Sequence, residues 1–138
     1  MDAGNVDAKM LSMLERVLDL SSRRHQLIAA NIANVDTPGF HTKDIDFYGA
    51  LKEAIASNES QSSNSSLAGL LGFAAPTQLD SQPQVIEPEG LALRNDGNNV
   101  NADREMANMA SNSLQYTLAT ELLGREFSVI RGAIREGK

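Results

Sequence analysis

Two histidines and a pair of neighbouring aspartates are the residues with which this chain of 138 amino acids could do chemistry. His25 falls within a predicted helix, where a solvated surface side chain is the ordinary interpretation. His41 lies close to Asp44 and Asp46 in the sequence. On a strand those two carboxylates would point to opposite faces, which is a poor geometry for a catalytic pair.

The sequence contains none of the common catalytic or phosphate-binding spacings, such as G-x-S-x-G, H-E-x-x-H, a P-loop or G-x-G-x-x-G. It also has no cysteine, which excludes disulfides, thiolate metal sites and a cysteine nucleophile. We therefore predict no enzymatic activity, no cofactor, no metal and no small-molecule substrate. The opposing hypothesis, an enzyme, would require an activity that depends on His41 or Asp44.

The net charge of −6 argues against nucleic acid as a partner, because phosphate binding needs basic surface. The charge is uneven: residues 41–100 carry three basic and eight acidic groups, whereas residues 1–40 and 101–138 are nearly neutral. Nearly neutral ends could pack against copies of themselves without self-repulsion. Chance scatter explains the charge pattern, taken alone, equally well.

A long helix is predicted near the N-terminus, from Asp7 to Asn34, because apolar residues recur there at spacings of three and four. Asn5 or Asp7 could cap its start. Thr37–Phe40 suits a type II turn after its end, with Gly39 at the position that needs a positive φ.

The amides Asn31 and Asn34 lie three residues apart near the end of this helix. They could bond the last carbonyls of the helix and the turn. They could also fix the register of an otherwise apolar helix contact. Both interpretations stay open at the level of sequence.

A second long helix is predicted at the C-terminus, where apolar and small residues alternate by four and three as in a heptad seam. The seam consists of Ala102, Met106, Met109, Ser113, Tyr116, Thr120, Leu123, Phe127, Ile130 and Ile134. Asn101 is a suitable N-cap, and Gly137 is a natural stop.

The middle of the chain has no long periodic pattern. Ile45–Ala56 could form a short strand leading into a helix, and Gln84–Ile86 and Leu91–Leu93 could be short strands. Asp96–Asn99 reads as a turn, and the polar stretch Ser57–Ser66 reads as a loop.

The sequence therefore predicts a mainly α fold, with the long terminal helices packed as a coiled-coil-like hairpin and a small irregular or β middle. Its three parts are residues 1–40 (helix and turn), 41–100 (loop-rich middle) and 101–138 (C-terminal helix). Such a hairpin has a small core, so we expect its outer faces to need neighbours.

One motif resembles a known family. Ala30–Phe40, which reads ANIANVDTPGF, is similar to the N-terminal signature of the flagellar axial proteins. Lys43–Phe47, Asp96–Met106 and Asn112–Tyr116 resemble segments of the short proximal rod proteins of that family.

The resemblance covers residues 1–53 and 93–138. Asn101 and Ala102 depart from the family's pattern, where an acid and a bulkier apolar residue are expected. The polar stretch after Ala56 carries no family signal.

The resemblance implies a structural subunit of the flagellar basal-body rod, assembling helically into a hollow drive shaft that carries torque from the membrane ring to the hook and lets export substrates pass. Its implied partners are copies of itself, other rod proteins, the rod-base adaptor, the membrane ring, the type III export apparatus and the rod assembly cap. The implied location is the rod in the periplasmic space, reached by export without a cleaved signal. The expected motif and assembly residues are Asn31, Asn34, Thr37, Pro38, Gly39, Phe40, Met106, Met109, Tyr116, Leu123, Phe127 and Ile130.

Two other identities remain open from the sequence. The chain could be another short rod subunit. It could also be a soluble coiled-coil regulator or partner of the flagellar type III export system, which would be a folded cytoplasmic monomer or dimer.

Overall fold

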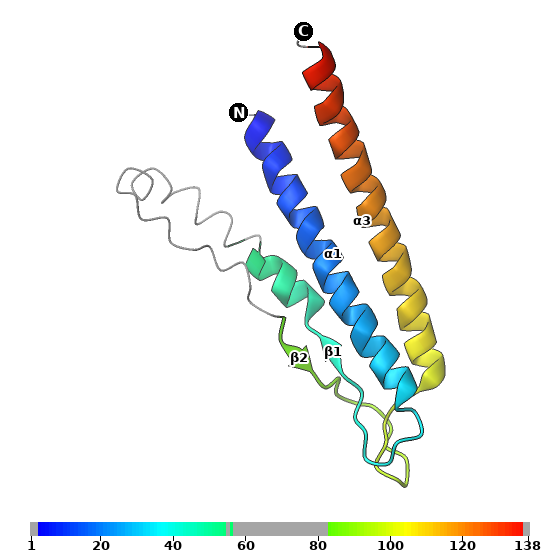
Figure 1. Cartoon of the computed structure of the whole chain (residues 1–138). Coiled ribbons are helices and arrows are strands. Elements are labelled where there is room, and N and C mark those ends of the chain that lie inside the picture. Colours follow the sequence, from blue (N-terminus) through cyan, green and yellow to red (C-terminus); the bar gives the residue numbers. More distant parts are fainter. Residues whose placement is uncertain (1–2, 55, 57–82, 137–138) are drawn as a thin grey trace.

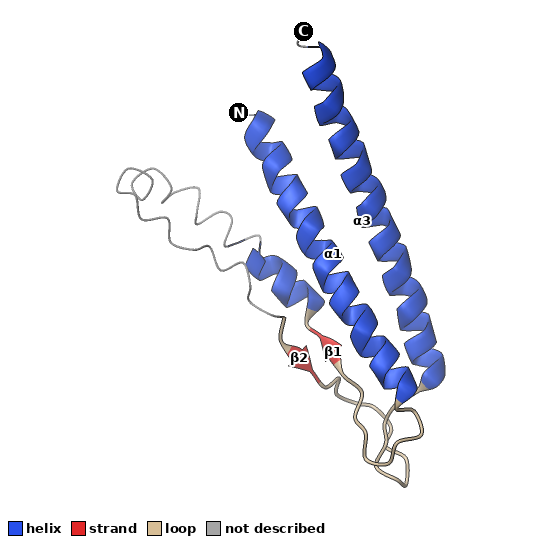
Figure 2. Cartoon of the chain, viewed as in Figure 1, coloured by secondary structure: helices blue, strands red, loops and turns tan. Residues whose placement is uncertain are grey.

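The computed structural model describes residues 3–54, 56 and 83–136. Two long helices, α1 (Ala3–Ala33) and α3 (Ala102–Glu136), run antiparallel and pack against each other, most closely near the bend (Figure 1). Because α1 ends where α3 begins, both chain termini lie at the end of the hairpin opposite the bend. The predicted fold class, a terminal-helix hairpin with a small middle segment, is confirmed (Figure 2).

The helix boundaries agree with the prediction at the bend and differ at the N-terminus. α1 already begins at Ala3, so the predicted caps Asn5 and Asp7 are wrong. Both residues are inside the helix, whereas a cap needs a non-helical backbone. At the start of α3 the predicted cap is confirmed, because Asn101 Oδ1 accepts a 3.1 Å hydrogen bond from the Arg104 N–H. The predicted stop at Gly137 lies outside the described residues.

The middle segment packs beside α1 as a two-stranded antiparallel ribbon and a short helix (Figure 2). Strand β1 (Asp44–Ile45) pairs with β2 (Val85–Ile86), and β1 leads into helical residues 47–54. The predicted strand-then-helix over Ile45–Ala56 and the strand near Gln84–Ile86 are therefore confirmed.

The predicted strand over Leu91–Leu93 is wrong. The chain turns at Gly90, whose φ is 77°, and β1 is only two residues long, so it offers no edge on which these residues could continue the ribbon. The predicted loop Ser57–Ser66 lies outside the described residues.

The buried apolar core is small, and it lies along the face where α1 meets α3 and the ribbon. It consists of Leu14, Leu20, Ile28, Ile45, Val100 and Ala119. Within the described part of the chain, no helix is long and apolar enough to cross a membrane. Because few apolar side chains are buried in the described part of the chain, hydrogen bonds at the bend take a large share in positioning the two helices.

Candidate functional site: the bend and the outer face of α3

The turn that follows α1 has the predicted type II form. Gly39 has a φ of 71°, and the Phe40 N–H donates to the Thr37 carbonyl oxygen at 3.3 Å. Asn34 bonds the end of its own helix and the turn, which is the first of the two interpretations given above for this amide. Its Nδ2 donates to the Ala30 carbonyl at 2.8 Å, and its Oδ1 accepts from the Thr37 hydroxyl at 3.1 Å.

The carbonyls of the turn that follows α1 are bonded by a residue from the loop before α3. Asn98 is fully buried, and its Nδ2 lies 3.0, 3.1 and 2.8 Å from the carbonyl oxygens of Asn34, Val35 and Thr37. Its Oδ1 accepts from the Val100 N–H at 2.7 Å. The carbonyls at the end of α1 are bonded by the Asn34 and Val35 N–H groups, and Asn98 holds the turn beyond them against the loop before α3. Sequence reasoning recognised the turn around Asn98 but not this role.

A backbone contact joins the same two segments. The Gly39 N–H donates to the Asp96 carbonyl at 2.9 Å. Gly97, with a φ of 79°, lies against Gly39, and a Cβ at position 97 would come within 3.6 Å of the Gly39 Cα. A little further along both segments, Asn99 Oδ1 accepts a hydrogen bond from the Thr42 N–H at 2.7 Å. Two glycines in the left-handed region therefore face each other across the bend.

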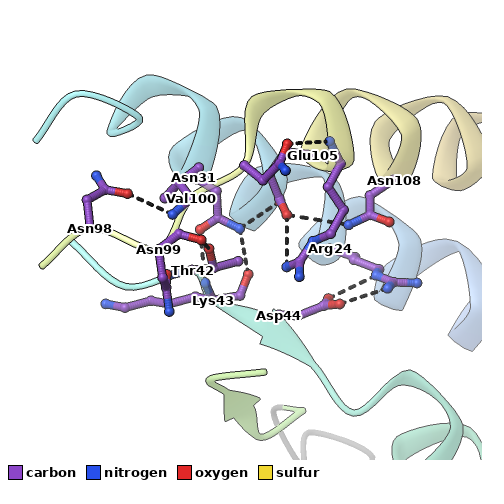
Figure 3. A network of polar contacts seen from close by, with 12 residues as sticks. Arg24, Asn31, Thr42, Lys43, Asp44, Asn98, Asn99, Val100, Glu105 and Asn108 are labelled. Carbon is purple, nitrogen blue, oxygen red and sulfur yellow. Dashed lines mark hydrogen bonds and ion pairs between the residues drawn. The ribbon is translucent and has the colours of Figure 1, made fainter. Parts of the chain in front are cut away.

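Asn31 connects three parts of the chain (Figure 3). It is buried, and its Nδ2 donates to Glu105 Oε2 of α3 at 2.9 Å and to the Lys43 carbonyl at 2.8 Å. Its Oδ1 accepts from the Lys43 N–H at 3.0 Å. The hypothesis that one amide fixes the register of the helices stays a prediction, and Asn31 is the amide placed to do so. We call Asn31, Asn98 and Asn99 the amide cluster.

The aspartates considered for chemistry have structural contacts instead. Asp44 accepts two hydrogen bonds from the Arg24 guanidinium, at 2.9 and 2.7 Å, which tie β1 to α1 (Figure 3). Asp46 Oδ1 accepts from the Gly49 N–H at 2.9 Å and so caps the helical residues that follow. His41 Nδ1 lies 3.1 Å from Glu87 Oε2 on the surface.

Among the described residues, no group of His, Asp or Glu is arranged to hold a metal ion.

The face that α3 turns toward α1 coincides only in part with the apolar seam predicted from the sequence. Its buried residues, Glu105, Asn112 and Ala119, are spaced by seven and lie one position before Met106, Ser113 and Thr120 of the predicted seam. Asn112 Nδ2 donates to the Ser21 carbonyl of α1 at 2.8 Å. The helices pair as predicted, but the stripe on α3 that contacts α1 is largely polar.

Most apolar side chains of α3 are consequently exposed. Among the predicted assembly residues Met106, Tyr116 and Phe127 are exposed, whereas Met109, Leu123 and Ile130 are half-buried at the edge of the contact with α1. The further exposed apolar residues of α3 are Leu114, Leu118, Leu122, Val129 and Ile134. An exposed apolar surface of this length is typical of a helix that packs against another chain.

Comparison with known proteins gives a consistent result. Residues 20–41, which include the end of α1 and its turn, match the family described as flagella basal body rod protein. The flagellar basal body rod protein FlgB of Borrelia hermsii is 36% identical over 135 residues, 95% of this chain and 99% of that protein. The FlgB proteins of Salmonella typhimurium and Escherichia coli are each 33% identical over 131 residues, 92% of this chain and 94% of theirs.

Proposed function

Because the chain belongs to the FlgB family of flagellar basal body rod proteins, we propose that it enters the rod by packing the exposed apolar face of α3 against neighbouring subunits. The chain is a structural subunit of the proximal rod. The observation that carries the proposal is the placement on α3, where Glu105 and Asn112 are buried against α1 while most of the large apolar side chains are exposed. A subunit that folded alone would gain by burying those apolar residues instead.

The two ends of the chain suit such packing. Residues 1–40 and 101–138 are nearly neutral, so like charges do not oppose contact between copies. We propose that these two parts form the assembled core and that residues 41–100, which account for most of the chain's net negative charge, lie toward its outside.

We also propose the partners, the export route and the location that are expected for a member of this family. The partners would be copies of the chain, other rod proteins, the rod-base adaptor, the membrane ring and the rod assembly cap. The subunit would pass the type III export apparatus without a cleaved signal and join a hollow shaft in the periplasmic space that carries torque and lets later substrates through. No catalytic role is proposed.

The exposed position of Phe127 gives a direct test, because a change there should leave the hairpin intact. We expect Phe127→Asp to reduce strongly the amount of subunit retained in detergent-extracted basal bodies, since a carboxylate in an apolar contact is unfavourable by several kcal/mol. Ser128→Asp, at the next and also exposed position, is the matched control. Normal incorporation and motility of Phe127→Asp, with secretion measured separately, would contradict the proposal.

A further inference from the structure

The exposed apolar residues of α3 form two rows rather than one. Each residue advances an α-helix by about 100°, so Leu114, Leu118 and Leu122 lie together on one flank of the stripe that faces α1. They are 63%, 52% and 50% exposed, respectively. Residues four apart make the ridge that one helix inserts between the side chains of another. We call these three residues the leucine ridge.

The opposite flank is hollowed. A groove of about 450 Å³ runs between α1 and α3 and is lined by Ser21, Ser22, His25, Gln26, Asn112, Ser113, Tyr116 and Thr117. Most of these side chains are small, and neither Lys, Arg, Asp nor Glu is among them. The groove and the leucine ridge therefore occupy opposite faces of the two-helix layer.

The hydroxyl groups on the α3 side of the groove are already bonded within the helix. Ser113 donates to the Met109 carbonyl at 2.8 Å, and Thr117 donates to the Ser113 carbonyl at 2.9 Å. An apolar side chain could cover these hydroxyls without leaving a donor unpaired. The part of the wall formed by Ser113 and Thr117 thus accepts an apolar occupant, whereas Ser21 Oγ and Asn112 Oδ1, already buried at the groove, have no hydrogen-bond partner.

We infer that the leucine ridge of one copy of this chain packs into the groove of the next copy. The inference rests on the proposed assembly role, and it names the two surfaces that meet. Size agrees, because a cavity of about 150 Å³ holds a benzene molecule, so a groove three times as large has room for two or three leucine side chains. Neither surface has a charge that would have to be buried.

The placement of the two surfaces determines the kind of assembly. A contact between two different patches of the same molecule is heterologous, so each copy keeps one free ridge and one free groove. Such contacts continue from subunit to subunit and produce rings or open helices. A ridge packing on its own counterpart would instead stop at a dimer.

Cross-linking within assembled basal bodies tests the inference, and the natural chain contributes no cysteine of its own. Leu118→Cys on the ridge and Ser22→Cys in the groove would be introduced together and singly. On oxidation we expect the double variant to give a ladder of products beyond the dimer, with each single variant remaining monomeric.

Two results would overturn the inference. Self-cross-linking of Leu118→Cys alone would show ridge against ridge, and a product of another mass would show a different partner. Absence of cross-links in a double variant that is retained in basal bodies would also overturn it, while the proposed rod function would stand.

A substitution that fills the groove supplies a second measurement, including for the case in which the cysteine variants fail to assemble. We expect Ser113→Leu to lower the amount of subunit in basal bodies about tenfold or more, because overpacking a contact is unfavourable. Ser128→Leu, which adds the same side chain at an exposed position outside the groove, should be retained normally. Equal retention of the two variants would mean that no neighbouring subunit packs into the groove.

Discussion

The side chain of Asn98 uses both ends of its amide at the bend. Its nitrogen is near three carbonyl oxygens of the segment that ends α1, and its oxygen accepts a backbone N–H. No other side chain of similar size offers a donor and an acceptor in this arrangement. Asn98 is also completely buried, so water cannot replace what a substitution removes.

We therefore expect Asn98→Asp to lower the free energy of unfolding by about 3 kcal/mol, because a carboxylate would face the three carbonyls in place of a donor. Asn95→Asp makes the same chemical change at an exposed position of the same loop and should have little effect. Urea unfolding followed by far-UV circular dichroism would compare them. Similar midpoints for the two variants would contradict the role given to Asn98.

The positive φ of Gly39 leads to a prediction about substitutions at this position. A φ of 71° is unfavourable for a β-branched residue, so Gly39→Val should destabilise the bend by about 1–3 kcal/mol and impair motility. Gly39→Asn is the matched control, because asparagine tolerates this region better and nothing lies within 4 Å of the new Cβ. Equal motility of the two variants, at equal protein levels, would show that the conformation of Gly39 is not what matters.

Gly39 and Asn98 differ in how well their roles can be predicted from the sequence. The turn at Gly39 follows from its immediate neighbours, and the structure confirms it. The role of Asn98 depends on the turn after α1, more than sixty residues away, so local rules cannot predict it. Asn31 is intermediate, because a contact fixing helix register was considered, but its partner Glu105 was not identified.

At the scale of elements, the sequence predicts both long helices and their pairing but not the orientation of α3 about its axis. Apolar residues occupy more than one side of α3, so their spacing does not identify the stripe that faces α1. Polar contacts select it, namely Asn31 with Glu105 and Asn112 with Ser21. A pattern rule that places polar residues outside therefore assigns the wrong stripe.

The Arg24–Asp44 contact attaches the middle ribbon to α1, and its bidentate geometry needs a planar guanidinium. Arg24→Lys keeps the charge and should weaken the attachment by about 1 kcal/mol, since both side chains are partly exposed. We expect faster amide hydrogen exchange at Ile45 and Gly49 with no change at residues 105–112.

Arg125→Lys, at an exposed position of α3, should change neither region. Faster exchange throughout both helices of Arg24→Lys would show that the ion pair supports the hairpin rather than the ribbon.

At the scale of the whole molecule, burial decreases from the bend toward the chain ends. The amide cluster, Ile28 and Val100 are near the bend, whereas Leu14 and Ala119 are the buried residues farthest from it among those described. From residue 120 to residue 135, no described side chain of α3 is buried. Among the described side chains, buried contacts between the helices are concentrated toward the bend.

We expect the dilute monomer to show this gradient in hydrogen exchange. Amides of residues 21–33 and 102–112 should exchange slowly, and those of residues 9–14 and 122–135 should exchange quickly, because protection follows local burial and contact. In assembled basal bodies the second group should become slow as well. Uniform protection along both helices of the monomer would mean that the hairpin is complete without neighbours.

The contact of Asn98 with the turn after α1 also has a consequence in time. A chain that emerges N-terminus first, from a ribosome or any narrow channel, presents α1 long before the residue that caps it. The stretch between Asn34 and Asn98 amounts to about 200 Å of extended chain. Throughout that interval the carbonyls of the turn after α1 have no donor from Asn98, and α3 has not yet begun. Formation of the bend is therefore delayed, because Asn98 emerges only after about two thirds of the polypeptide.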